Sequence, residues 1–363
     1  MRARRCCFGD GKFCSRPIPV GQNTECYTAI TTARMTRDKT VTTNPIDGAY
    51  PVELHPPNIE PYRAGNTAIE FVSTFDSGKP GPHVLLTALT HGNEICGAIA
   101  LDTLLRAGLR PSAGKLTFSF NNHMAYALFD PAAPDESRFV DEDFNRVWAE
   151  QRLDGNEDSA ELRRARELRP LVNAVDMVLD IHSMSTYSVP LMICNGLEKE
   201  RLFARAVDYP GHIMCGSGHV VGKRMIEYTP FNDPTNDKVA LLVECGQHWA
   251  ADTGRVAMDT ACKFLAASGT VNPAAVAPFL SDQARAAKRA EMWDVTDGIT
   301  ARTDNFQFAQ PYVGMEVIPL QGTEIANDDG EPVATPYDNC LLMMPNYKPG
   351  AGTRKLRFCK RVG

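Results

Sequence analysis

Between residues 84 and 267, short apolar runs alternate with longer segments of helical periodicity. The apolar runs cover 84–89, 116–120, 176–181, 189–193 and 239–243, and the helical segments cover 94–109, 159–174, 199–207 and 255–267. Apolar strands separated by helices are typical of parallel sheets that are covered on both faces. The alternation therefore predicts an α/β domain with a mixed, largely parallel sheet flanked by helices.

Ionisable side chains follow three of the predicted strands. His91 and Glu94 follow the first strand, His182 follows the strand over 176–181, and Glu244 follows the strand over 239–243. The carboxyl ends of parallel strands meet at one edge of a sheet, where the functional groups of α/β proteins collect. We therefore expect these four side chains to lie close together.

Two histidines and one carboxylate make up a catalytic zinc site, which keeps its fourth position open. His91 and Glu94 are three residues apart and can face one point, although a chain with eight histidines also contains such pairs by chance. His182 alone is equally explained as a buried, hydrogen-bonded histidine. Its matching strand-end position favours one zinc ion bound by His91, Glu94 and His182. Asp180 either accepts a hydrogen bond from the His182 ring or simply ends the strand.

Glu244 ends an otherwise apolar run, where a carboxylate is costly unless it faces a polar cleft or a partner. We interpret Glu244 as a general base that takes a proton from the attacking water and delivers it to the leaving amine. The alternative is a structural glutamate in a salt bridge. His248 is a rival base, which we expect at the surface or around the ligands.

A long polar segment, 121–148, separates the second predicted strand from the next helix, and long loops in compact domains are often functional. It contains Arg138, Asn145 and Arg146. Guanidinium groups bind carboxylates in bidentate fashion and can stabilise an oxyanion. The alternative is a solvated loop with local ion pairs.

Four motifs together resemble the succinylglutamate desuccinylase/aspartoacylase family, a branch of the zinc carboxypeptidase-like fold. They are His91-Gly92-Asn93-Glu94, the run from Arg138 through Asp143-Phe144-Asn145-Arg146, Asp180-Ile181-His182 and Glu244-Cys245-Gly246. The resemblance covers residues 80 to 265 approximately.

This resemblance implies that His91, Glu94 and His182 bind one zinc ion and that Glu244 is the general base. It also implies that Asn145 and Arg146 bind a substrate carboxylate and that Arg138 polarises the scissile carbonyl. The expected activity is zinc-dependent hydrolysis of the amide bond in a small N-acyl amino acid or a related acyl amide. A carboxypeptidase-type peptidase and a catalytically silent binding protein of the same fold stay open.

The segments on either side of the alternating region differ from it in character. Residues 1–45 lack periodicity and are predicted to be disordered or an extension, with Met35 as a candidate start. The hydrolase domain is expected over 46–270, a linker over 271–290 and a small β domain over 291–363. Short β-prone pieces between glycine, asparagine and proline turns indicate the last of these.

Charge and cysteine content limit the partners and the compartment. The net charge is −6, which argues against a nucleic acid or an acidic membrane recognised through bulk positive charge. No apolar run approaches the roughly 20 residues of a membrane span. The expected partner is a small substrate with a carboxylate, and a homo-oligomer stays open. Of eleven cysteines, those at 96, 194, 245 and 262 lie in or beside apolar runs, so we expect a reduced, cytoplasmic protein.

Overall fold

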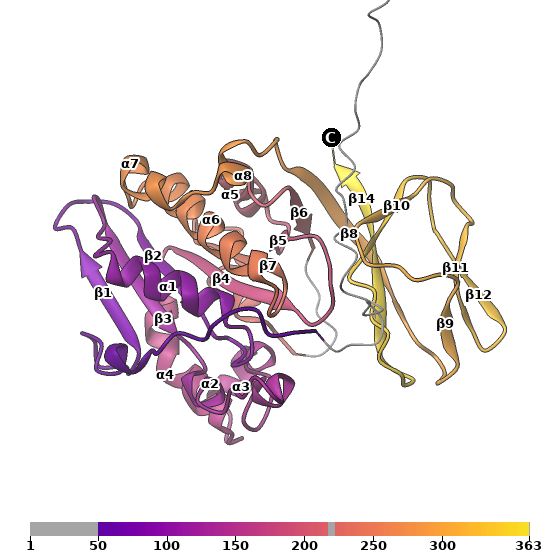
Figure 1. The fold of residues 1–363 in the computed structure, drawn as a ribbon, viewed down its shortest axis with the longest axis horizontal. Coiled ribbons are helices and arrows are strands. Elements are labelled where there is room, and N and C mark those ends of the chain that lie inside the picture. The colour runs from indigo at the N-terminus through magenta and orange to yellow at the C-terminus, as the bar shows by residue number, and fades with distance from the viewer. Residues whose placement is uncertain (1–49, 217–221, 363) are drawn as a thin grey trace, which may run out of the picture. The chain divides into compact units, whose positions relative to one another are not determined.

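The computed structural model describes residues 50–216 and 222–362 (Figure 1). The predicted N-terminal extension, with Met35 and the four cysteines of the first thirty residues, lies outside the described residues. No helix in the two described ranges is both long enough and apolar enough to cross a bilayer.

Strands and helices alternate in the first two thirds of the described chain, and strands dominate the last third. The helices are α1 Cys96–Arg106, α2 His123–Tyr126, α3 Glu150–Asp154, α4 Ala160–Ala174, α5 Glu198–Val207, α6 Ala251–Ser268, α7 Pro273–Val276 and α8 Asp282–Arg285. The strands are β1 Val72–Asp76, β2 His83–Ala88, β3 Lys115–Phe120, β4 Met177–Met184, β5 Leu191–Cys194, β6 His212–Cys215, β7 Val239–Gln247, β8 Glu291–Thr300, β9 Phe306–Phe308, β10 Glu316–Ile318, β11 Glu324–Asp328, β12 Glu331–Ala334, β13 Cys340–Met343 and β14 Arg354–Val362.

One mixed sheet runs through the described chain in the order β1-β3-β2-β4-β7-β5-β6-β8-β14-β13-β10. Strands β3, β2, β4 and β7 are parallel to one another, as are β5, β6 and β8. The other neighbouring pairs are antiparallel. A small antiparallel sheet, β12-β11-β9, lies beside the C-terminal strands. The predicted α/β class with a mixed sheet is therefore confirmed.

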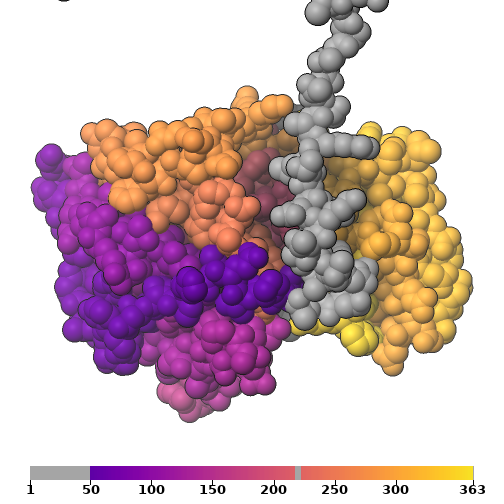
Figure 2. All heavy atoms as spheres, viewed as in Figure 1, coloured from indigo at the N-terminus to yellow at the C-terminus, as the bar shows by residue number. Residues whose placement is uncertain are grey.

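The C-terminal strands β8, β14, β13 and β10 continue the central sheet without a break. Figure 1 labels β10 and β14 toward one end of the described residues and β1 at the other, in keeping with the two edges of the sheet order, and Figure 2 shows the C-terminal residues (yellow) gathered at the first of these ends. The predicted boundaries at 270 and 290 stay a prediction. Strand β6 and most of the C-terminal strands were not expected from the sequence.

Side chains alternate between the two faces of the central strands and build two separate cores. In β7, Leu241 and Val243 pack into the core that includes α1, α5 and α6, whereas Ala240 and Leu242 pack into the core that includes α4. The same alternation continues into the polar residues. Glu244 therefore lies on the α4 side of the sheet, at the carboxyl end of the parallel block.

Three predicted boundaries of strands and helices are wrong near the carboxyl ends of the parallel strands. His182 and Glu244 lie inside β4 and β7, which extend to Met184 and Gln247, because these two strands stay paired with each other past their apolar runs. Glu94 lies in the turn before α1, and not in the helix, which begins at Cys96. The register pairs His182 directly with Glu244 across β4 and β7.

Candidate metal centre

A tight turn after β2 places His91 and Glu94. Leu89 takes a left-handed backbone conformation, with φ of 59°, although it is a buried leucine. Gly92 follows at a point where an added Cβ would lie 2.3 Å from the carbonyl oxygen of Ser137 and 2.5 Å from backbone atoms of the α2 helix. Only glycine fits so close to these backbone atoms. Gly92 therefore lets the turn that carries His91 and Glu94 pack directly against the long loop. The Gly92 N–H also donates to the carbonyl of Arg138, at 3.1 Å.

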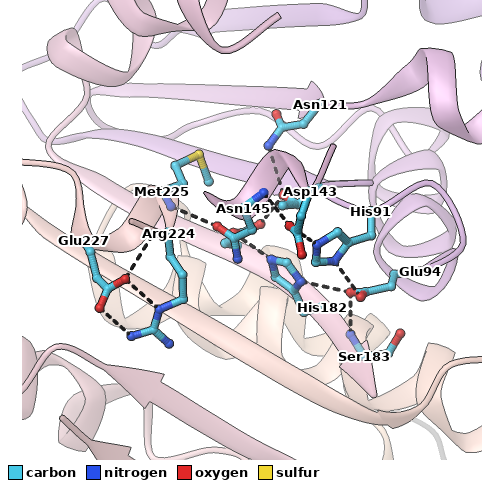
Figure 3. Close-up of polar contacts among 12 residues, drawn as sticks. His91, Glu94, Asn121, Asp143, Asn145, His182, Ser183, Arg224, Met225 and Glu227 are labelled. Atoms are coloured by element: carbon cyan, nitrogen blue, oxygen red, sulfur yellow. Dashed lines mark hydrogen bonds and ion pairs between the residues drawn. The ribbon is translucent and has the colours of Figure 1, made fainter. Parts of the chain in front are cut away.

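His91, Glu94 and His182 are buried and converge, with one ligand atom from each lying within 4.8 Å of the others. The Nδ1 atoms of the two histidines both face the carboxylate of Glu94, at 2.7 Å for His91 and 2.9 Å for His182 (Figure 3). The N–H of Ser183 donates to the same carboxylate at 2.9 Å. The structure therefore brings together the three residues predicted as ligands, two from the turn after β2 and one from β4.

The far nitrogen of each ring contacts a second carboxylate. His182 Nε2 lies 2.8 Å from Asp180, and His91 Nε2 lies 2.8 Å from Asp143. A carboxylate behind a ligating histidine fixes the ring and makes its other nitrogen a better metal ligand. The sequence indicated this role for Asp180, two residues before His182, but Asp143 was missed because it comes from a loop far away in sequence.

The charged groups of this cluster stabilise one another's ionised forms. Burial lowers the pKa of His182, but the carboxylates of Asp180 and Glu94 outweigh burial and raise it well above its usual value. Burial raises the pKa of Glu94, and the two histidines outweigh it, so that the pKa lies well below the usual range. Two imidazoles and an ionised carboxylate at one buried point are the donor set that a divalent metal such as zinc takes.

Glu244 lies beside this cluster and differs from the other carboxylates in its surroundings. Its Oε2 atom is buried and has no hydrogen-bond partner among the residues that the structure describes. Burial, and then the nearby carboxylate of Glu94, raise the pKa of Glu244 to about 8. A carboxyl group with a pKa near neutrality can both accept and return a proton. The sequence alternative of a salt bridge finds no support, since none of the ion pairs in the described ranges includes Glu244.

Arg138 extends from the long loop over the cluster. Its guanidinium group donates to Glu94 at 3.3 Å and to Asp143 at 3.2 Å. Asn145 is buried, and its side-chain oxygen accepts a hydrogen bond from the N–H of Met225 at 2.9 Å. Arg146 donates to the carbonyl of Asn145 at 2.7 Å. The loop is therefore ordered around the site, unlike the solvated loop that was the alternative.

All seven predicted site residues line one cavity of about 450 Å³, a size that suits a small ligand. Its other walls come from the segment after β4 and from the C-terminal strands β8, β13 and β14. His248 also lines it and is buried, so of the two expected positions, at the surface or around the ligands, the structure shows the second. The Nδ1 atom of His248 lies 2.8 Å from the hydroxyl of Ser183. Burial lowers the pKa of His248 to about 3, which makes it a poor base.

Glu161, a buried residue of α4, holds the loop that carries Arg138 and Asp143. Its carboxylate accepts hydrogen bonds from the N–H groups of Val140, Asp141 and Glu142 at 2.7, 3.0 and 3.2 Å, and from the side chain of Asn122 at 2.9 Å. A carboxylate that accepts several N–H groups in a buried position contributes strongly to local order. Nothing in the charged sequence of this helix indicates that Glu161 has this role.

We predict that Glu161→Gln lowers the free energy of unfolding by about 2 kcal/mol, because its amide group turns a donor toward N–H groups that need an acceptor. Urea unfolding followed by circular dichroism measures this change. Asp158→Asn serves as the control, since Asp158 pairs with Arg163 at the exposed start of the same helix. Equal stability of the two variants would contradict the assigned role of Glu161.

A model of the succinylglutamate desuccinylase/aspartoacylase catalytic domain matches residues 80–267. The chain belongs to this family. The family consists of hydrolases that remove acyl groups, and the predicted resemblance is confirmed. No curated protein sequence matches the chain.

Solved structures of similar fold cover most of the chain at low sequence identity. Succinylglutamate desuccinylase from Vibrio cholerae is 16% identical with a TM-score of 0.58, and the match covers 81% of this chain and 86% of that one. A succinylglutamate desuccinylase/aspartoacylase from Rhodobacter sphaeroides is 18% identical with a TM-score of 0.57, covering 81% and 90%. The product-bound ectoine utilization protein EutE (DoeB) from Ruegeria pomeroyi is 15% identical with a TM-score of 0.54, covering 80% and 89%. At these identities the structures establish a shared fold.

Proposed function

We propose that this chain is a zinc-dependent amidohydrolase that removes the acyl group from a small N-acyl amino acid or a related acyl amide. The observation that carries the proposal is the convergence of His91, Glu94 and His182 within 4.8 Å in a cavity that Glu244 and Arg138 also line. Membership in a family of deacylases supports the reaction type. The zinc carboxypeptidase-like architecture is part of the same proposal.

The three side chains His91, Glu94 and His182 suit a catalytic metal ion. The two Nδ1 atoms and the Glu94 carboxylate face one another, and Asp143 and Asp180 hold the far nitrogens of the rings. Three protein ligands leave a coordination position for substrate or water. When bound there, zinc supplies Lewis acidity, which polarises a carbonyl and makes water a stronger acid.

The chain's own side chains then divide the work of amide hydrolysis. Glu244 takes the proton of the attacking water on its orphaned Oε2 and passes it to the leaving amine. The guanidinium of Arg138 stabilises the negative charge that develops on the carbonyl oxygen. Asn145 and Arg146 bind the carboxylate of the amino acid and so orient the amide over the ligands.

We further infer that the chain works in a reducing compartment such as the cytoplasm. The seven cysteines that the structure describes, which include the four expected from the sequence, are buried and in the thiol form. Buried thiols without disulfides are typical of proteins from reducing compartments.

The decisive experiment measures zinc content and turnover on the same preparation. We expect about one zinc ion per chain and release of free amine from a panel of N-acetyl and N-succinyl amino acids. A preference for short peptides with a free C-terminus would instead identify a carboxypeptidase-type enzyme. Stable zinc binding without turnover of either panel would identify a silent binding protein and refute the proposed reaction.

We predict that Arg146→Gln raises KM for the preferred N-acyl amino acid by about a hundredfold, because a charge-assisted carboxylate contact is lost. The control is a matched substrate, the same N-acyl amino acid with its carboxylate replaced by a carboxamide. Wild type should turn this substrate over poorly, and the variant should turn it over as well as wild type does. If the variant loses activity equally on both substrates, Arg146 does not anchor the carboxylate.

A further inference from the structure

A row of buried polar side chains leads across the sheet to the proposed metal ligand His182. Its members are Ser119, Asn121, Thr90 and Asp180, each no more than 1% exposed. The first two come from the end of β3, the third follows β2 and the fourth is in β4, and these strands are neighbours in the order β3-β2-β4. Buried polar groups are costly unless they are hydrogen-bonded, so the partners of these side chains show what the row does.

The contacts of the row form one continuous chain of hydrogen bonds. Oγ of Ser119 lies 2.8 Å from Oδ1 of Asn121, and Nδ2 of Asn121 lies 3.2 Å from Oγ1 of Thr90. Oγ1 of Thr90 lies 2.7 Å from Oδ1 of Asp180, and the other carboxylate oxygen, Oδ2, lies 2.8 Å from Nε2 of His182. The chain therefore connects β3 with a residue of the ligand cluster on β4.

The direction of each hydrogen bond follows from the end at Asp180. A carboxylate only accepts, so Thr90 donates its single hydroxyl proton to Asp180. The Thr90 oxygen then accepts from the neighbouring amide, and Asn121 turns its NH2 group toward it. The amide oxygen of Asn121 is left to accept from the hydroxyl of Ser119. Every donor in the row therefore points toward Asp180, and hydrogen bonds aligned in this way strengthen one another.

This direction determines which nitrogen of His182 is free for a metal ion. Thr90 occupies Oδ1 of Asp180 and the ring faces Oδ2, so Nε2 of His182 carries a proton and donates it. In a neutral ring the lone pair is then on Nδ1, the atom that faces Glu94 at 2.9 Å in the ligand cluster. A hydrogen bond to the outer nitrogen sets both the tautomer and the orientation of a ligating histidine.

Backbone contacts hold the middle of the row in place. Arg164 of α4 donates from Nε to the carbonyl oxygen of Asn121 at 2.8 Å, and the N–H of Asn121 donates to the carbonyl oxygen of Ala88 at 2.9 Å. Arg164 is itself buried, so water does not compete for these hydrogen bonds. Asn121 is therefore fixed from α4 and from β2, and its amide group is a rigid link in the chain.

We propose that Thr90, Asn121 and Ser119 are positioning residues of the metal centre. They act through Asp180 to hold the His182 ring in the tautomer and orientation that bind a metal ion. The inference rests on the metal site of the proposed function and not on the proposed reaction, so zinc binding alone can test it. None of the three is one of the converging ligands, so their replacement leaves the ligand set complete.

The test measures the Kd of the full chain for Zn²⁺ by competition with a chelator of known affinity. Thr90→Val keeps the shape of the side chain and loses the hydroxyl. We expect it to raise Kd about five- to tenfold, less than the ten- to hundredfold effect of a group that contacts a ligand directly. Asn121→Leu, which removes the group that orients the Thr90 hydroxyl, should raise Kd in the same direction by a smaller factor.

Thr90→Ser separates the hydroxyl from the packing of the side chain. This variant keeps the hydroxyl and loses a buried methyl group, so it should lower the midpoint of urea unfolding. Its Kd for Zn²⁺ should stay close to that of the wild type. A loss of zinc affinity in Thr90→Ser as large as in Thr90→Val would show that packing, and not the hydroxyl, supports the site, and would overturn the proposal.

Thr87→Val is the matched control. Thr87 of β2 is fully buried and pairs in register with Ser119 and Asp180, but its hydroxyl has no hydrogen-bond partner among the described residues. The same substitution there removes a buried hydroxyl that lies beside the chain and outside it, and should leave Kd unchanged. Asp180→Asn should raise Kd more than Thr90→Val does. Adding Thr90→Val to Asp180→Asn should then change Kd little, because both act on the same ring.

The outcomes separate this proposal from the deacylase proposal. Equal Kd values for Thr90→Val and Thr87→Val would overturn the positioning role and leave the deacylase function intact. Fully additive effects of Thr90→Val and Asp180→Asn would overturn the action through Asp180. Weaker zinc binding in Thr90→Val but not in Thr87→Val, in a protein that hydrolyses no acyl amide, would support the positioning role and overturn the deacylase function.

Discussion

Replacing Glu244 with glutamine is expected to reduce kcat for N-acyl amino acid hydrolysis by about a thousandfold while zinc stays bound. The amide has the same shape as the carboxylate but cannot take a proton from water, and general base catalysis contributes factors of about a hundred to ten thousand. Glu244 is not one of the three converging ligands, so its replacement leaves the donor set complete. Amine release measures kcat, and elemental analysis measures zinc.

The fold of this variant should be intact for a specific structural reason. The Oε2 atom of Glu244 accepts no hydrogen bond from the described residues, so an amide nitrogen in its place takes no acceptor away from an existing donor. Glu331→Gln, at an exposed position of β12, controls for the loss of one negative charge. Full activity of Glu244→Gln would refute the base assignment, and loss of zinc would make Glu244 a ligand.

The ligand cluster could be predicted from the sequence because it depends on two properties of β-sheets that are visible in short stretches of sequence. A parallel strand ends at the same edge as its neighbours, and side chains alternate along it. His91 after β2, His182 in β4 and Glu244 in β7 therefore had to lie near one edge, provided that the three strands were neighbours. The order β2-β4-β7 fulfils this condition.

The errors concern features that depend on residues far apart in sequence. A strand continues while its neighbours offer backbone partners, so β4 and β7 include polar residues that an apolar pattern excludes. Asp143 reaches His91 only because Glu161 of α4 holds the intervening loop by its N–H groups. None of these contacts leaves a periodic signal in the sequence.

The C-terminal strands show the same limit most clearly. Residues 354–362 contain a bulge that breaks the alternation by which a strand is recognised. Their partner β8 lies more than fifty residues earlier in the sequence, at 291–300. Arg354 and Arg357 of β14 therefore carry no recognisable motif, although they line the same cavity as the family residues.

Replacing His91 with alanine is expected to reduce the zinc content to less than a tenth of an ion per chain and to abolish hydrolysis. Removing one of three protein ligands weakens metal binding far more than a tenfold change in Kd, since Asp143 also loses the ring that it orients. Elemental analysis after dialysis against a zinc-free buffer measures the content. His55→Ala, an exposed histidine away from the cavity, should retain the wild-type value.

The variant Asp143→Asn distinguishes two explanations of this cluster. One is a metal centre, and the other is a buried hydrogen-bond network that serves only to stabilise the fold. The amide of this variant can still contact the His91 ring but no longer makes its Nδ1 atom more basic. Zinc affinity is therefore expected to fall by about ten- to a hundredfold, which competition with a chelator of known affinity measures. The free energy of unfolding without zinc should also fall, because the ion pairs of Asp143 with His91 and Arg138 lose one charge, so the zinc affinity is the measurement that decides. A large loss of stability with unchanged zinc affinity would instead make this network structural and would remove the basis for the proposed catalytic centre.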